Sequence, residues 1–106
     1  MIIRIWHGAT TKENAAAYER LLQEVIFPGI RAKNVKGYKG IQLLKSVQPN
    51  KVEFVTVMGF EDLASVKDFA GDDYEQSYVI DEAKRLLNDY DAKATHFELA
   101  VNDLSF

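Results

Sequence analysis

The sequence has no cysteine, and its 106 residues include only two histidines. The lack of cysteine excludes disulfide bonds, thiolate nucleophiles and metal sites built on cysteine ligands. No apolar run reaches the roughly 18 residues that span a membrane. The apolar start from Ile2 to Ile5 is interrupted by Arg4, unlike the core of a secretory signal. We therefore expect a soluble, cytoplasmic protein with no membrane partner.

Charge and recognisable catalytic motifs are also sparse. Thirteen basic and sixteen acidic residues give a net charge of -3, and both signs are spread along the chain. Because no basic stripe is present to bind phosphates, nucleic acid is not an expected partner. The sequence contains neither the phosphate-binding pattern G-x-x-x-x-G-K nor the zinc pattern H-E-x-x-H. We expect no cofactor and no metal site.

Four segments show the alternation of side chains that is typical of strands, and a helical pattern follows the first of them. The strands are predicted over residues 2–8, 38–47, 52–60 and 93–101, with a turn at 48–51. Thr10 and Glu13 fit a capping box at the start of the helix. Pro28 and Gly29 are predicted to end it, because a residue before proline avoids helical angles.

Two further helical pieces are expected between the last two strands. The first begins near Asp62 and ends at Gly71, and the second begins at Asp72 and Asp73. The resulting order, βαββαβ, predicts one α+β domain over residues 1–106. It has a ferredoxin-like, four-stranded antiparallel sheet with helices on one face. Because both faces of the strands are largely apolar, we expect a homodimer in which two such sheets pack face to face.

The two histidines lie on the first and last predicted strands of the chain, His7 on the first and His96 on the last. If partner residue numbers on these antiparallel strands add up to about 103, the two rings are cross-strand neighbours. An imidazole can act as a base, a hydrogen-bond donor or a metal ligand near neutral pH. The alternative is two partly buried histidines that bond to backbone groups or carboxylates.

Four other side chains have a functional and a structural interpretation. Trp6 can stack on a planar substrate or pack in the core. Tyr74 and Tyr78, four residues apart, share a helix face if that segment is helical, and direct their hydroxyls at a ligand or at water. Arg4 lies on the same strand face as Trp6 and needs a partner there. We expect it to hold a carboxylate at the dimer interface, with an anionic substrate group as the alternative.

Three segments resemble a known family. They are Arg4-Ile5-Trp6-His7-Gly8, Phe69-Ala70-Gly71-Asp72-Asp73 and Thr95-His96-Phe97-Glu98. With this order of elements, the sequence resembles the antibiotic biosynthesis monooxygenase domain family of dimeric α+β barrel proteins. The resemblance implies a pocket between sheet and helices in each subunit. Its implied substrate-binding residues are Trp6, Phe69 and Tyr74, and its implied catalytic residues are His96, Tyr78 and, in support, His7.

The resemblance implies a cofactor-independent monooxygenase-like protein that acts on a small planar aromatic or quinone-like molecule. A non-catalytic, small-ligand-binding or stress-related protein on the same scaffold is the alternative. Haem binding or haem degradation is a further alternative. Haem-degrading relatives take a histidine iron ligand from the second helical region, but this chain has neither His nor Trp between Phe60 and Lys93.

Overall fold

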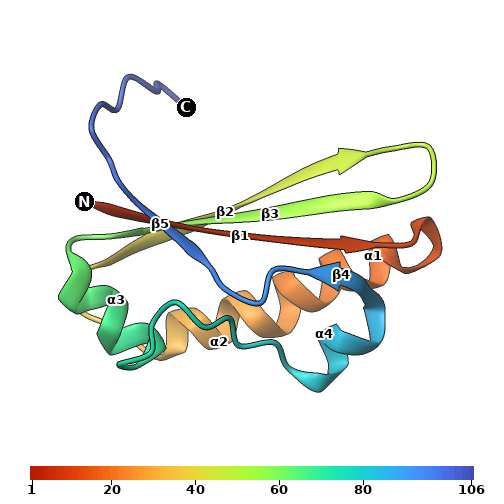
Figure 1. Ribbon diagram of the computed structural model, residues 1–106, viewed down its shortest axis with the longest axis horizontal. Coiled ribbons are helices and arrows are strands. Elements are labelled where there is room, and N and C mark those ends of the chain that lie inside the picture. Colours follow the sequence, from red (N-terminus) through yellow and green to blue (C-terminus); the bar gives the residue numbers. More distant parts are fainter.

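A computed structural model describes residues 1–106 and shows an antiparallel sheet with the helices on one face (Figure 1), as predicted. The elements, in chain order, are β1 (Ile2–Thr10), α1 (Lys12–Leu21), the π-helical turn η1 (Leu22–Ile26), α2 (Phe27–Ala32), β2 (Tyr38–Val47), β3 (Val52–Phe60), α3 (Leu63–Ala70), α4 (Asp81–Leu86), β4 (Leu87–Tyr90) and β5 (Thr95–Glu98). The strand order is β2-β3-β1-β4, and β5 also pairs with β1. The α+β, ferredoxin-like architecture is thereby confirmed.

The central hairpin of β2 and β3 has the predicted bounds. The Gln48 amide donates a hydrogen bond of 2.9 Å to the Lys51 carbonyl and closes the turn. On β3, alternate side chains from Val52 to Phe60 point to the helices, and Val52, Phe54, Met58 and Phe60 are buried. The other face of β3 carries no helix.

The last predicted strand, over residues 93–101, is the shorter β5 in the structure, and β4 before it is a strand that the sequence did not predict. β4 pairs with residues 8–10 of β1 and β5 pairs with residues 2–5, so both occupy the same edge of β1 in succession. His96 of β5 pairs with Arg4 of β1. The predicted register would have paired it with His7, three residues further along β1. Because an odd shift moves a side chain to the other face of a sheet, the prediction that His7 neighbours His96 is wrong.

The first helix continues past its predicted end at Pro28. It runs through η1 into α2 and ends at Ala32. Pro28 lies directly after the π-helical turn η1, so the backbone donor that proline lacks is missing where the regular α-helical hydrogen bonding is already interrupted. The helix also begins one residue later than predicted, since the Thr11 hydroxyl rather than Thr10 caps it by accepting from the Asn14 amide at 3.2 Å.

The second helical piece, predicted from Asp72, begins only at Asp81 as α4, and residues 71–80 before it are not helical. α3 itself ends as predicted, with Gly71 at a φ of 91°. The segment then runs beside the link from β4 to β5. The Ser77 amide donates to the Ala92 carbonyl at 3.1 Å, and the Ala94 amide donates to the Glu75 carbonyl at 2.8 Å. Tyr74 and Tyr78 therefore do not share a helix face.

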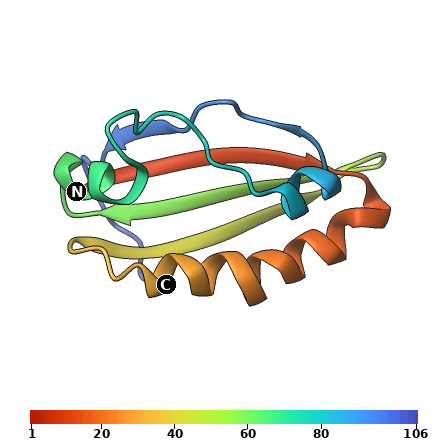
Figure 2. The same cartoon turned by 90° about the horizontal axis from the view of Figure 1, so that it is seen from below.

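Two clusters of buried apolar side chains lie between the sheet and the helices. The larger consists of Tyr18, Leu22, Val52, Phe54, Ala83 and Leu87, and the smaller of Met58, Phe60 and Val66. Figure 2 shows the helix from α1 to α2 along one side and the 71–80 segment along the other. No helix has both the length and the apolar character needed to cross a membrane.

Candidate functional site

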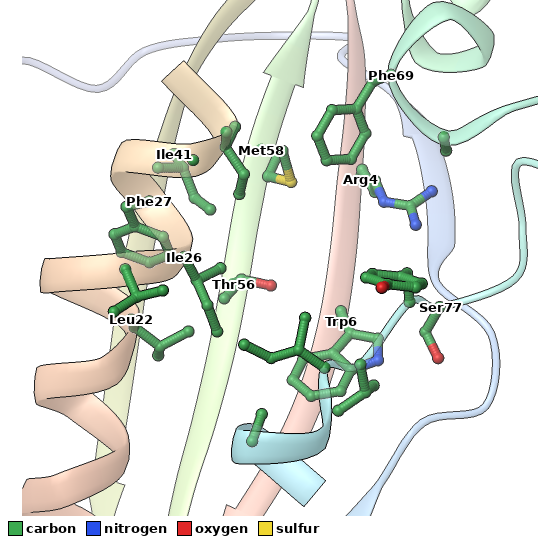
Figure 3. A pocket seen from close by; sticks show the side chains of 18 of the residues that line it. Arg4, Trp6, Leu22, Ile26, Phe27, Ile41, Thr56, Met58, Phe69 and Ser77 are labelled. Atoms are coloured by element: carbon green, nitrogen blue, oxygen red, sulfur yellow. The ribbon is translucent and has the colours of Figure 1, made fainter. Parts of the chain in front are cut away.

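A cavity of about 570 Å³ lies between the sheet, the helix from α1 to α2 and residues 76–83. Figure 3 shows side chains from both sides projecting into it. Fifteen of its 21 lining residues are hydrophobic, so it suits a mostly apolar ligand. Its volume is within the usual range for small-molecule sites. The cavity opens to solvent near Val25 and Tyr78, which are 54% and 89% exposed.

Trp6 and Phe69 form aromatic parts of the wall. The indole N–H of Trp6 donates to the Asp91 carbonyl at 2.9 Å, which fixes the orientation of the ring. Gly8 leaves room for that ring, since a Cβ atom there would lie 2.9 Å from the Trp6 side chain. These flat apolar surfaces can pack against a planar ligand.

Arg4 is the charged residue of the sheet floor, and only 7% of it is exposed. Its guanidinium donates to the carbonyls of Tyr74 and of Gln76, the latter at 3.3 Å. One of its Nη atoms also lies 3.0 Å from Nε2 of His96. Because a guanidinium has only donors, Nε2 of His96 accepts, and His96 is the neutral tautomer with its proton on Nδ1.

The charge of Arg4 also acts on His96. Burial and then the nearby Arg4 charge lower the pKa of His96, against a smaller opposite effect of Glu75. His96 is therefore neutral at pH 7. Its lone pair at Nε2 is already used by Arg4, so the ring has no free basic nitrogen.

No carboxylate forms an ion pair with Arg4. The two ion pairs of the structure join His7 to Asp91 and Lys45 to Glu19. Burial lowers the pKa of Arg4, as expected for a cation without a counter-ion. The three hydrogen bonds of Arg4 leave two of its five N–H donors without a protein acceptor. Arg4 lies on the helix-covered face, away from the sheet face through which the dimer was expected to form, and no carboxylate of this chain is the expected partner.

Other polar groups of the wall come from several elements. Tyr18, on α1, is only 1% exposed, and burial raises the pKa of its hydroxyl, so it stays protonated. Its hydroxyl makes no hydrogen bond to the protein and is available to a ligand. Thr56 and Lys33 also line the cavity. The Ser77 hydroxyl donates to the carbonyl of Asp91 at 2.8 Å or of Ala92 at 2.9 Å. Tyr18 was not among the residues that the sequence suggested for the site, because its place on the helix gives no sign that it faces a cavity.

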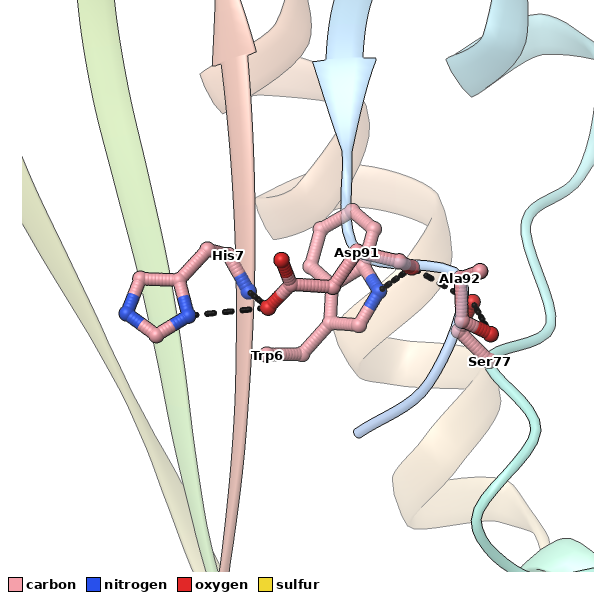
Figure 4. Close-up of polar contacts among 5 residues, drawn as sticks. All are labelled: Trp6, His7, Ser77, Asp91 and Ala92. Carbon is pink, nitrogen blue, oxygen red and sulfur yellow. Dashed lines mark hydrogen bonds and ion pairs between the residues drawn. The ribbon is translucent and has the colours of Figure 1, made fainter. Parts of the chain in front are cut away.

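The structure separates the residues that the sequence suggested for one site. Trp6, Phe69 and Tyr78 line the cavity. His96 and Tyr74 lie behind Arg4, with their rings 5.1 Å apart, and do not line the cavity. His7 projects from the opposite face of β1, where its Nδ1 lies 2.9 Å from the Asp91 carboxylate (Figure 4). His7 therefore does not project into the cavity that was expected to hold it as a supporting residue.

The residues present do not fit a haem held by a histidine. The cavity wall contains no histidine, and Nε2 of His96 is bonded to Arg4. The structure also contains no group of three or more His, Cys, Asp or Glu side chains placed to hold a metal ion.

Solved structures share this fold. The chain is 20% identical to a candidate antibiotic biosynthesis monooxygenase from Deinococcus radiodurans, at a TM-score of 0.67 over 100% of this chain and 98% of the other. A second such protein, from Bacillus cereus, is 12% identical, at a TM-score of 0.65 over 99% and 96%. The haem degrader MhuD from Mycobacterium tuberculosis, solved with two haems in its active site, is 16% identical. Its TM-score is 0.58 over 96% of this chain and 98% of the other.

Comparison by sequence adds no relative to these structures. No protein-family model matches the sequence, and no curated protein matches it. At 12–20% identity the structural likeness is a likeness of fold. The chain therefore has the α+β, ferredoxin-like fold of the two candidate antibiotic biosynthesis monooxygenases.

Proposed function

We propose that the protein is a cofactor-independent monooxygenase-like enzyme that acts on a small planar aromatic or quinone-like molecule. The observation that carries this proposal is the open, mainly apolar cavity of about 570 Å³ with Trp6 and Phe69 in its wall. Two proteins of the same fold are candidate antibiotic biosynthesis monooxygenases, which supports the reaction class. The substrate and the reaction are inferences from the cavity and from these relatives.

The proposed reaction needs only the substrate and O2. A ring CH2 group of an anthrone-like molecule becomes a carbonyl: one oxygen atom enters the product, and the other leaves as water with the two hydrogens. The protein orients the ring between Trp6 and Phe69, and Tyr78 lies at the mouth, where it can donate to a substrate oxygen. His96 acts through Arg4, because its Nε2 accepts from the guanidinium rather than facing the cavity. It is thus a positioning residue.

An oxygen electrode with anthrone as substrate tests the proposal. We expect saturable uptake of one O2 per anthraquinone formed, with label from ¹⁸O2 in the new carbonyl. His96→Ala should lower turnover about tenfold or more, because Arg4 loses a charged hydrogen bond that orients it. His7→Ala, at the only other histidine and on the opposite sheet face, is the matched control and should change turnover less than about twofold.

Two results contradict the enzyme proposal. One is O2 uptake no faster than in buffer alone, and the other is equal turnover in wild type and a folded His96→Ala variant. The second candidate function, a non-catalytic small-ligand-binding protein, is favoured by one observation: the only histidine near the cavity has no free basic nitrogen. It predicts that aromatic ligands raise the melting temperature without consuming O2.

We also propose that the protein works as a homodimer through the open face of its sheet. Ile3, Ile5, Val55 and Val57 share this face with Leu44 and Phe97, which are 49% and 52% exposed. No helix of the chain covers them (Figure 1). An apolar face of this kind is typical of a protein interface. A second copy of the same sheet would cover it and leave the cavity, on the other face, accessible.

A further inference from the structure

We propose that the natural ligand of the cavity is an anion with a flat apolar body, and that its charged oxygens bind between Arg4 and Lys33. This inference deepens the proposed function, since it concerns the same cavity and names the charge of the ligand. A carboxylate and an ionised phenol share this chemistry. The inference needs binding but no turnover.

The unpaired charge of Arg4 is the first support. An arginine with only 7% of its residue surface exposed normally has a carboxylate or phosphate partner, because removing a charge from water is costly. Here all its acceptors are neutral: two backbone carbonyls and the imidazole of His96. Two N–H donors remain, and Arg4 lines the cavity (Figure 3). A ligand oxyanion would supply both the missing charge and the missing acceptors.

A second cation lies at the same end of the cavity. The ammonium group of Lys33 lies 4.7 Å from the centre of the Phe69 ring, and the guanidinium carbon of Arg4 lies 5.8 Å from the same centre. Two positive charges therefore lie near the Phe69 ring, and no carboxylate among the lining residues offsets them. An anion beside this ring would interact favourably with both, so the ring marks the polar end of the site.

The rest of the wall agrees with an anionic ligand. The chain carries sixteen acidic residues and a net charge of -3, yet none of the lining residues is Asp or Glu. The other lining residues are apolar or neutral, which suits the uncharged body of such a ligand. The wall therefore favours a molecule that is charged at one end and flat and apolar at the other.

Calorimetric titration with a matched pair of ligands tests this charge preference. The pair is 2-naphthoate and 2-naphthamide, which have the same ring and nearly the same shape but differ in charge. We expect the carboxylate to bind about tenfold or more tightly than the amide, since hydrogen bonds to charged groups are the stronger ones. Equal or tighter binding of the amide would overturn the inference while leaving the proposed function intact.

Variants identify the two cations as the source of the preference. Lys33→Gln should reduce the carboxylate-to-amide ratio about threefold, and Arg4→Gln should abolish it, leaving amide binding within about twofold. Lys12→Gln, which removes the same charge from an exposed residue that does not line the cavity, should leave the ratio unchanged. A ratio that survives both Lys33→Gln and Arg4→Gln contradicts the inference. If Arg4→Gln does not fold, the inference is tested by the carboxylate-to-amide binding ratio of the wild type and by the reduction of this ratio in Lys33→Gln.

Failure of this inference can be distinguished from failure of the proposed function. Binding of the carboxylate without any O2 uptake from anthrone supports the inference and contradicts the oxygenase. If neither naphthalene compound binds, the cavity is not an aromatic site and both proposals fail.

Discussion

The contact between Arg4 and His96 shows how one hydrogen bond defines the chemistry of two residues. Because the guanidinium can only donate, the imidazole must accept, and its tautomer and neutral state follow. The same bond keeps Arg4 in place without neutralising its charge. A carboxylate in the place of His96 would have paired with Arg4 and removed the positive charge from the cavity.

This contact predicts a pH dependence of stability. The pKa of His96 is lowered in the folded protein by burial and by Arg4, so the unfolded chain binds a proton at a higher pH than the folded one. The stability that neutral His96 contributes to the folded protein is therefore fully present above its ordinary pKa of 6.5. It is lost as the pH falls through the lowered pKa of the folded state. Urea denaturation at pH 7.5 and 5.0 should show a larger loss of unfolding free energy in wild type than in His96→Gln.

The comparison with His96→Gln isolates one group, because every other titrating side chain is common to both proteins. His7→Gln is the control, since it removes the other histidine and should leave the contribution of His96 in place. If wild type and His96→Gln lose equal stability between the two pH values, the neutral, Arg4-bonded state of His96 is contradicted.

At the scale of single residues, the sequence predicted the sheet face of a side chain better than its hydrogen-bond partners. Alternation along β1 correctly placed Arg4 on the same face as Trp6, because the side-chain period of a strand is fixed. It could not identify the acceptors of Arg4, since Tyr74 and Gln76 contribute backbone carbonyls from an irregular segment. The prediction that His7 and His96 are neighbours was wrong because it depended on a strand register that nothing in the sequence of β5 specifies.

Among the elements, those with strong local signals were predictable. β2 and β3 have their predicted bounds because long alternating segments flank a turn containing Pro49 and Asn50. The 71–80 segment was mistaken for a helix, since its acidic start and apolar spacing fit one. In the structure its amides and carbonyls bond to the link between β4 and β5, which is remote in sequence. Such a tertiary contact overrides local preference and cannot be read from the segment alone.

The start of α1 gives a prediction at the element scale. The Thr11 hydroxyl satisfies the otherwise unbonded Asn14 amide in the first turn, at 3.2 Å. Thr11→Ala should lower the free energy of unfolding by about 1 kcal/mol, the usual effect of removing such a cap. Thr11→Ser keeps the hydroxyl and should recover most of this loss in thermal or urea denaturation. Equal losses in the two variants would show that the hydroxyl does not stabilise the helix.

For the whole molecule, the two faces of one sheet differ in what covers them. The helix-covered face carries the cavity. The open face carries apolar side chains on β2, β3 and β1, and Gln42 and His7 lie among them. The chain after β5 rises on the open side (Figure 1), and its Val101, Leu104 and Phe106 are 80%, 62% and 95% exposed. Apolar surface on both the sheet and this tail favours a partner on that side.

Val57 is the position at which to test the dimer. It lies on the open face of β3, between Ile5 of β1 and Gln42 of β2. Wild type should elute with twice the 12.0 kDa mass of one chain in light scattering coupled to size exclusion. Val57→Lys should elute as a folded monomer, because burying an unpaired ammonium between two sheets is costly whereas exposing it to water is not.

Ala16→Lys is the matched control, since it adds the same charge at an exposed position of α1 and should leave the mass of the dimer unchanged. The two variants separate the effect of the open face from a general effect of added charge. A wild type of 12.0 kDa would contradict the dimer, as would a Val57→Lys variant that keeps the doubled mass. Because Arg4 and Val57 lie on opposite faces of the sheet, a folded Val57→Lys monomer should still prefer 2-naphthoate to 2-naphthamide. Association and ligand binding would then be properties of separate surfaces of this chain.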